Sequence, residues 1–329
     1  MTGLGVSPAL LMAVTCLGAG LLTWLARRYA LRRQLFDLPG ARRSHQVATP
    51  RGGGVAIVLA VLALALLAAQ QWPQACTALL LFATGLLLVA GIGWWDDHRP
   101  LPALQRLLVH LLAAALLAIA ASLHGAAYWQ CGLVFLLAAS LINIWNFMDG
   151  INGIASTQAI VAALGFAVVL PAPWSLAPLA IAAACLGFLP FNFPRARIFM
   201  GDVGSGALGY VMAALFTIAL LVVPSLSWPL ALVPFTAFLV DAGFTLLSRM
   251  LSRQRWTEPH TQHVYQRAVK AGAGHPLVTS VYALLGMLGS LLLVPASALA
   301  PLPQAGVALA WCGLSTCLWL LARWRLRHY

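Results

Sequence analysis

Four short polar segments interrupt an otherwise apolar chain, and each carries side chains that could hold a metal ion or a phosphate group. They read G-W-W-D-D-H-R at 93–99, N-I-W-N-F-M-D-G-I-N-G at 143–153, F-N-F-P-R-A-R-I-F-M-G-D-V-G-S-G at 191–206 and E-P-H-T-Q-H-V-Y-Q-R at 258–267. Carboxylate oxygens brought together from several segments are the ligands that Mg²⁺ or Mn²⁺ prefers, and such ions are usually shared with substrate phosphates. The sequence therefore predicts phosphate chemistry with a divalent cation, provided that the fold brings the four segments together.

Three aspartates stand out because each lies in a polar, glycine-containing break between apolar runs, where a carboxylate needs a partner or a function. They are Asp97, Asp149 and Asp202. Asp202 lies between Gly201 and Gly204 at the expected start of a helix, so we expect backbone N–H groups there to approach phosphate oxygens. Asp37 and Glu258 are interpreted as ordinary solvated loop charges.

Two pairs of polar side chains have helical spacing. Asn143 and Asn146 are three residues apart, so one helical face would present both amides to a nucleotide or to the Asp149 carboxylate. His260 and His263 have the same spacing, and a helical turn would place both imidazoles on one face. The sequence therefore predicts two helical faces that could bind substrate.

Arginines near these segments supply positive charge that suits phosphate recognition. The candidates are Arg43, Arg51 and Arg267. Most of the other cations are interpreted as determinants of membrane topology or of contact with anionic lipids. His110 and His124 lie away from the four segments, and we expect structural or incidental roles for both.

The elements that must position these side chains are transmembrane helices. Of the 329 residues, 62% are apolar and only 8% are charged, whereas soluble domains have about 25% charged residues. This composition excludes an ordinary soluble protein, and the length allows about eleven spans of roughly 20 residues. Six cysteines show no C-x-x-C spacing, so they are expected to be small buried side chains rather than a metal or redox site.

The apolar runs and the positive charges predict one topology. All nineteen lysines and arginines lie in or beside alternate connections or in the C-terminal tail, which satisfies the positive-inside rule. The net charge of +12 is therefore explained without nucleic acid. We expect an all-α membrane protein of about eleven helices, with a periplasmic N-terminus and a cytoplasmic C-terminus. Residues 1–329 would form one polytopic domain, with the active site on the inward loops 27–51, 96–102, 148–152, 192–202 and 249–274.

The four segments, in this order, resemble those of the polyprenyl-phosphate N-acetylhexosamine-1-phosphate transferase superfamily, glycosyltransferase family 4, which includes the WecA and MraY types. The resemblance covers about residues 36–270, and N-x-x-N-F-x-D-G-x-N-G with F-M-G-D-x-G-S is its most specific part. It implies an eleven-helix enzyme of the bacterial cytoplasmic membrane. The implied reaction transfers a sugar-1-phosphate from a UDP-N-acetylhexosamine to undecaprenyl phosphate, with Mg²⁺ or Mn²⁺ and release of UMP.

The resemblance also implies roles for individual residues. Asp202 would be the leading metal ligand, and Asp149 would be a second metal or nucleotide contact. Asp97, together with Asp96, would deprotonate or orient the lipid phosphate. The late histidine motif would hold phosphate or sugar with Arg267. A covalent intermediate on Asp97 is chemically permissible and is kept as an alternative. Direct attack by the lipid phosphate is favoured, because a lipid phosphate is already largely ionised near neutral pH.

Pro100 occupies the last position of the family's D-D-x-x-D motif, so a third carboxylate from that loop is missing. The late H-x-x-H motif, the first loop A-T-P-R-G-G-G and the compact length favour the O-antigen and related HexNAc-1-phosphate branch over the MurNAc-pentapeptide branch, which is kept as the alternative. The particular sugar and the oligomeric state, including a homodimer, stay open.

Two rival classes explain the sequence less well. A secondary transporter would place ionisable groups near the bilayer midplane and repeat its halves, but the acidic residues gather at one face and no internal repeat is evident. A CDP-alcohol phosphotransferase would continue D-G-x-x-A-R, which is absent after Asp149-Gly150.

Overall fold

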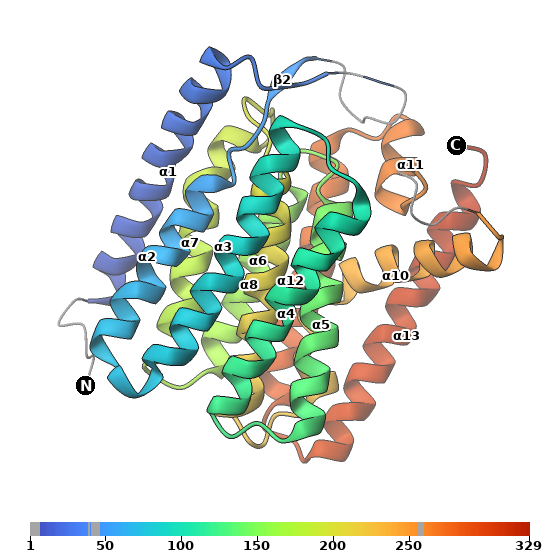
Figure 1. Cartoon of the computed structure of the whole chain (residues 1–329). Helices are drawn as coiled ribbons and strands as arrows, with labels where there is room; N and C mark the ends of the chain where they lie inside the picture. Colours follow the sequence, from blue (N-terminus) through green and yellow to red (C-terminus); the bar gives the residue numbers. More distant parts are fainter. Residues whose placement is uncertain (1–6, 39, 41–46, 255–259) are drawn as a thin grey trace.

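The structure is a computed structural model that describes residues 7–38, 40, 47–254 and 260–329. The described chain is almost entirely helical (Figure 1). Its helices are α1 (Pro8–Arg32), α2 (Val55–Gln71), α3 (Cys76–His98), α4 (Ala103–Leu123), α5 (Tyr128–Met148), α6 (Ile154–Val169), α7 (Leu176–Asn192), α8 (Asp202–Val222), α9 (Trp228–Ala231), α10 (Thr236–Leu251), α11 (Val264–Lys270), α12 (His275–Ala296) and α13 (Pro301–Arg325). The described residues also contain two short 3-10 helices, η1 (Pro73–Ala75) and η2 (Val233–Phe235), and one antiparallel pair of strands, β1 (Phe36–Asp37) and β2 (Thr49–Pro50).

The helices have the lengths and apolar character of a membrane protein. Among the described residues, eight helical segments are long and apolar enough to cross a bilayer. Three further apolar helices, α2, α6 and α7, have 16 or 17 residues, or about 25 Å at 1.5 Å per residue. Large leucines are exposed on the outer helices, for example Leu17 on α1 and Leu302 on α13. The prediction of an all-helical integral membrane protein is therefore confirmed.

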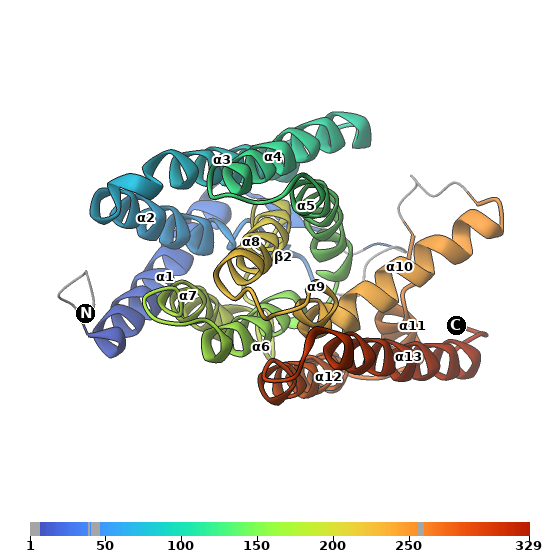
Figure 2. The same ribbon diagram turned by 90° about the horizontal axis from the view of Figure 1, so that it is seen from below.

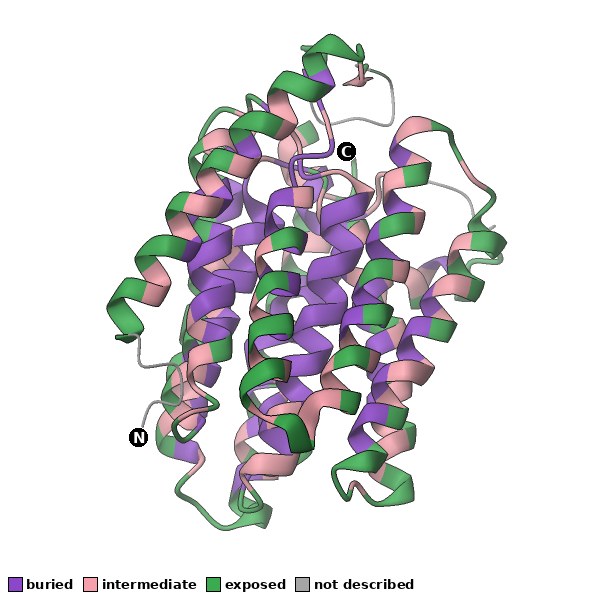
Figure 3. Cartoon of the chain, turned by 60° about the vertical axis from the view of Figure 1, so that its left-hand side comes forward, coloured by how far each residue is buried: buried purple, intermediate pink, exposed green. Residues whose placement is uncertain are grey.

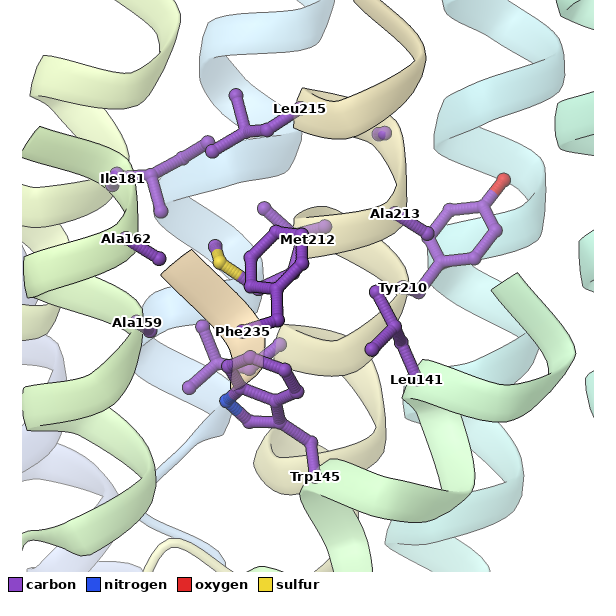
Figure 4. Packing of buried hydrophobic residues seen from close by; sticks show 14 of the residues in the cluster. Leu141, Trp145, Ala159, Ala162, Ile181, Tyr210, Met212, Ala213, Leu215 and Phe235 are labelled. Atoms are coloured by element: carbon purple, nitrogen blue, oxygen red, sulfur yellow. The ribbon is translucent and has the colours of Figure 1, made fainter. Parts of the chain in front are cut away.

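Helix α8 lies near the middle of the bundle, between the α3–α5 group and helices α6 and α7 (Figure 2). Seventeen of its 21 residues are buried, as expected for a helix that is apolar on all sides. Trp145 on α5 meets Phe235 edge-on with ring centroids 5.7 Å apart, beside Met212 of α8 (Figure 4). Buried residues fill the interior and exposed ones cover the outer faces (Figure 3). The packing of α8 in the core therefore fixes the position of Asp202, the first residue of this helix.

Several helices extend further than the apolar runs predicted. Helix α1 continues to Arg32, so Arg27 and Arg28 lie on the helix and not in the expected 27–51 loop. Arginine is a good helix former, it is favourable at a helix C-terminus, and its long side chain can reach out of an apolar layer. Helix α3 likewise continues to His98, which places the Asp96-Asp97 pair in its last turn instead of in a 96–102 loop.

The β1–β2 pair, α11 and the C-terminal end of α13 lie at one end of the bundle, at the top of Figure 1. Helices α3 and α5 end at this end of the molecule, and α8 begins there. Asp97 in the last turn of α3 accepts a hydrogen bond from the first residue of α8, and Phe147 near the end of α5 accepts one from Tyr265 of α11. The expected loop 249–274 is partly helical, since α10 continues to Leu251 and α11 occupies residues 264–270. The described parts of all four polar segments thus lie at the ends of helices.

Candidate active site

Asp202 is the first residue of α8, as the sequence predicted. Gly201 precedes it with a φ of +77°, a left-handed conformation that glycine adopts without strain. Gly93 on α3 lies so close to Asp202 that an added Cβ would collide with the Asp202 backbone. The absence of side chains at these two glycines therefore lets α3 approach the start of α8.

Asp97 caps the start of α8. Its Oδ1 accepts a hydrogen bond from the Asp202 amide at 3.1 Å, and its Oδ2 accepts one from the Val203 amide at 3.2 Å. The expectation that these N–H groups would approach a phosphate is therefore wrong, because a buried carboxylate of the same protein already occupies them. Asp97 is 3% exposed, and its capping bonds are of the kind that stabilise a helix N-terminus.

Arg106 bridges two of the candidate carboxylates. Its Nη1 lies 2.9 Å from Asp202 Oδ2 and 3.1 Å from Asp96 Oδ2. Asp96 also accepts a hydrogen bond from the Leu101 amide at 2.7 Å. Sequence reasoning missed Arg106, which it counted only toward topology. The sequence feature that could have identified Arg106 as a site residue is its position in the first turn of α4, the helix that follows the D-D motif.

Asp149 brings further negative charge to this region. It follows the last residue of α5 as its C-cap and is half-buried. Burial raises the pKa of Asp149 well above its usual range, and the charges of Asp202 and Asp97 raise it further. Charges shift one another's pKa only over short distances, so the three carboxylates share one region that would attract a cation.

The donor set fits a magnesium or manganese ion that is completed by a substrate. Within residues 7–38, 40, 47–254 and 260–329, no group of three His, Cys, Asp or Glu side chains is placed to hold a metal alone. Asp202 and Asp149 offer hard oxygen ligands, and their mutual repulsion would be relieved by a divalent cation. Phosphate oxygens and water would supply the remaining ligands, as is usual for Mg²⁺.

The two predicted asparagines lie on α5 and are both engaged. Asn146 Nδ2 donates to Ser205 Oγ at 3.0 Å, which joins α5 to the first turn of α8. Asn143 Nδ2 donates to the Ala139 carbonyl at 2.8 Å, and its Oδ1 lies 3.3 Å from His110 Nδ1. His110 is therefore structural, as expected, but it is not remote from the site, because it orients a candidate side chain.

The late histidines do not form the expected helical turn. Residues 260–263 are irregular, and α11 begins at Val264 with His263 as its N-cap. The two imidazole rings nevertheless lie together, with centroids 4.9 Å apart. Burial, together with the charges of His263 and Arg249, lowers the pKa of His260 to about 4. Burial also lowers the pKa of His263, so both rings are neutral near pH 7 and can donate or accept hydrogen bonds.

Asp241 of α10 fixes the segment that carries these histidines. It is 1% exposed, and its two oxygens accept hydrogen bonds from five groups on four helices. The donors are the amides of Val264 and Tyr265, the hydroxyls of Thr245 and Tyr282, and the indole of Trp319. The signal that could have identified Asp241 is an acidic residue inside an apolar run. Asp241 holds α11 much as Asp97 holds α8.

Tyr265 connects the late histidine motif with the D-G motif. Its hydroxyl donates to the carbonyl of Phe147, the penultimate residue of α5, at 2.9 Å. Gly150 packs against the same hydroxyl, so closely that a Cβ at that position would collide with it. Arg267 lies one turn into α11, and its buried Nε has no hydrogen-bond partner among the residues that the structure places. Arg43 lies outside the described residues.

Fold and site together define an integral membrane protein with carboxylates gathered at the ends of α3, α5 and α8. A family model described as Glycosyl transferase family 4 matches residues 78–220. Decaprenyl-phosphate N-acetylglucosaminephosphotransferase from Mycolicibacterium smegmatis is 31% identical, across 83% of this chain and 79% of the relative. A probable undecaprenyl-phosphate N-acetylglucosaminyl 1-phosphate transferase from Bacillus subtilis is 28% identical, across 84% and 82%.

A phospho-N-acetylmuramoyl-pentapeptide-transferase from Moorella thermoacetica is also similar, with 32% identity across 75% of this chain and 86% of the relative. The chain belongs to the polyprenyl-phosphate N-acetylhexosamine-1-phosphate transferase superfamily, glycosyltransferase family 4.

Proposed function

We propose that this protein transfers an N-acetylhexosamine-1-phosphate from a UDP-sugar to undecaprenyl phosphate in the bacterial cytoplasmic membrane, with release of UMP. The product would start the synthesis of O-antigen or a related cell-envelope glycan. The observation that carries the proposal is the meeting of Asp202, Asp149 and the D-D motif at one end of the bundle, where Arg106 bridges two of the carboxylates. The activities for which the two similar phosphotransferases are named support it.

Asp202 and Asp149 would hold the Mg²⁺ or Mn²⁺ ion, which supplies charge neutralisation of the diphosphate. Arg106 keeps the Asp202 carboxylate in place from the side of α4. The neutral imidazoles of His260 and His263, with Arg267, would donate hydrogen bonds to phosphate or sugar oxygens.

Asp97 would orient the site and not form a covalent intermediate. Both of its oxygens accept backbone hydrogen bonds from α8, so a phosphorylated Asp97 would have to abandon the cap that places Asp202. Direct attack of the lipid phosphate on the UDP-sugar requires no such rearrangement. The geometry thus supports the single-displacement route.

Replacing His263 by Ala is expected to lower transfer at least about tenfold, or roughly 1.4 kcal/mol of transition-state stabilisation. The reason is that its imidazole is proposed to donate a hydrogen bond to the diphosphate of the UDP-sugar. Initial rates with purified protein test this. His124→Ala is the matched control, because His124 follows α4 at the opposite end of the helix from Arg106. Equal, small effects of the two changes would remove the histidines from the site.

We expect eleven spans, an external N-terminus and a cytoplasmic site. In a variant without the six native cysteines, single cysteines at Arg195 and Thr261 should react with an impermeant maleimide only from the cytoplasm. A cysteine at Ser225, in the exposed connection between α8 and α9, should react only from outside. Reaction of the Thr261 position from the periplasm would contradict both the topology and the placement of the site.

The test of the proposed activity is UMP release from a panel of UDP-sugars by membranes that contain the protein, with and without EDTA. We expect the protein to accept UDP-GlcNAc, UDP-GalNAc or their deoxy relatives as donors in preference to UDP-MurNAc-pentapeptide. We expect release that depends on added polyprenyl phosphate and stops with EDTA. A secondary transporter would release no UMP, and preference for the pentapeptide substrate would place the protein in the peptidoglycan branch.

A further inference from the structure

Two arginines from different helices meet at the junction of α11 and α13, at the end of the bundle where α13 ends (Figure 1). Arg267 belongs to α11, and Arg323 lies in the last turn of α13. They lie close enough for their positive charges to repel each other. Arg249 of α10 adds a third charge, which, like that of Arg323, acts on the buried His263. The junction therefore gathers like charges that an anion would stabilise.

Arg267 lies on the side of α11 that faces α13. Val264, three residues earlier on the same face of α11, packs against Trp319 of α13. Tyr265 lies on the nearly opposite face, because successive helical residues are turned by about 100°, and its hydroxyl bonds to α5. Arg51, by contrast, pairs with the second aspartate of the D-D motif and belongs to the candidate active site. The α11–α13 junction is therefore separate from the gathered carboxylates.

Two guanidinium nitrogens at this junction have no acceptor. Arg267 Nε and Arg323 Nη1 are buried, and neither has a hydrogen-bond partner among the described residues. The Nη2 of Arg323 donates to Ser248 Oγ of α10 at 2.6 Å, and its guanidinium lies over the Trp319 ring, 5.0 Å from the centroid. Arg323 is thus held in place with one unused donor. A buried donor without an acceptor is costly, so the pair favours a ligand that accepts from both.

The carboxylate beside these arginines is already engaged. Asp241 is the residue, among those that the structure places, whose negative charge acts on Arg323. It accepts five hydrogen bonds, none of them from an arginine. Glu258, another acidic residue of this part of the chain, lies outside the described residues. Within the described part of the chain, Arg267 and Arg323 thus bring two positive charges against one occupied carboxylate.

The C-terminal end of α13 lies where the headgroups of a bilayer are expected. Helix α13 is long and apolar enough to cross a membrane, and Arg323 lies in its last turn. Trp324 beside it is 57% exposed, as is typical of aromatic side chains at a membrane surface. Arginine side chains near a helix end extend toward that surface. A lipid phosphate would therefore lie within reach of Arg323.

We propose that Arg267 Nε and Arg323 Nη1 bind one phosphate group at the α11–α13 junction. Guanidinium groups form short, charge-assisted hydrogen bonds with phosphate oxygens, and one phosphate would satisfy both unused donors. Two sources offer this chemistry, the headgroup of an anionic phospholipid and a soluble phosphate, and the position at the end of α13 favours the lipid. The site goes beyond the proposed function. It uses only the Nε of Arg267, so the contact proposed between this side chain and the donor falls to its terminal nitrogens.

Thermal unfolding of the purified protein in a neutral detergent tests this site, because a ligand of the folded state raises the unfolding temperature. The probes are phosphatidylglycerol, phosphatidylcholine and inorganic phosphate, with EDTA present and without a UDP-sugar. We expect phosphatidylglycerol to raise the unfolding temperature, and phosphatidylcholine, which has no net charge, to raise it much less. In Arg323→Gln and Arg267→Gln the apparent Kd for phosphatidylglycerol should rise at least about tenfold.

Arg325→Gln is the matched control. It removes the same charge from the same turn of α13, but Arg325 is exposed and lies on another face of the helix. Its apparent Kd should stay close to that of the wild type. Each variant is compared with its own ligand-free unfolding temperature, so that a change in stability is not mistaken for a change in binding. Arg267→Gln, on a different helix, keeps the test valid if Arg323→Gln does not fold.

The two sources of phosphate give different results. A saturable shift with inorganic phosphate alone, lost in the same two variants, would identify a soluble phosphate as the ligand. No shift with either probe, or equal apparent Kd values for all three variants, would overturn the site. Absence of UMP release by the wild type would instead refute the proposed function, and it would leave this binding result unchanged.

Discussion

Replacing Asp202 by Asn is expected to abolish sugar-phosphate transfer, with a loss of at least about a thousandfold, or roughly 4 kcal/mol. The substitution removes the carboxylate that is proposed as the leading metal ligand. It keeps the backbone amide that Asp97 caps, so α8 should still start at the same residue. The Asn side chain has nearly the same volume, and the protein should remain folded in detergent.

Initial rates at saturating Mg²⁺, combined with the thermal unfolding temperature, separate the chemical effect from a folding defect. Arg106→Gln is a useful companion variant, because Arg106 pairs with the same carboxylate but is not a metal ligand, and its loss should be clearly smaller. Substantial transfer by the Asp202→Asn protein would show that this carboxylate does not hold the metal.

Asp149→Asn should lower transfer at least about a hundredfold, roughly 2.7 kcal/mol, without lowering the stability of the metal-free protein. A carboxyl whose pKa is raised in the folded state lowers the stability of the protein at every pH above the ordinary pKa of the group, and therefore at pH 7. Replacing this ionisable group by a neutral amide should therefore raise the unfolding temperature. Loss of activity together with a gain in stability is typical of a residue that is retained for function.

Asp241→Asn is the matched control for Asp149→Asn, because Asp241 is a carboxylate with a structural role. Its amide nitrogen would face N–H and O–H donors that now bind an oxygen, and one unsatisfied buried group costs about 1–3 kcal/mol. We expect a lower unfolding temperature for Asp241→Asn and not for Asp149→Asn, both measured in EDTA. Equal destabilisation by the two variants would show that Asp149 is also structural.

The sequence was sufficient to predict the parts of the fold that depend on local pattern. Long apolar runs predicted the membrane helices, and Gly201-Asp202 correctly marked the start of α8. The family followed from two specific motifs, at residues 143–153 and 199–205. Helix ends were less accurate, because arginines and aspartates continue a helix beyond the apolar run, as in α1 and α3.

The interactions that assemble the site could not be read from the sequence. Asp97 reaches a backbone 105 residues away, and Arg106 reaches a carboxylate 96 residues away. Such pairs depend on how α3, α4 and α8 pack, which no local spacing encodes. The same is true of Asp241, whose five donors come from four helices. A neighbouring carboxylate therefore replaced the expected phosphate at the start of α8.

The proposed transfer of sugar-1-phosphate is tested most directly by following the β-phosphate of the UDP-sugar donor. Purified protein in lipid should be given UDP-GlcNAc labelled both in the sugar and in the β-phosphate, with undecaprenyl phosphate and Mg²⁺. We expect both labels to enter the lipid product in equal amounts, with one UMP formed for each sugar transferred. Release of UDP with only the sugar label in the lipid, or no labelled lipid from any UDP-N-acetylhexosamine, would contradict the proposed transfer of sugar-1-phosphate.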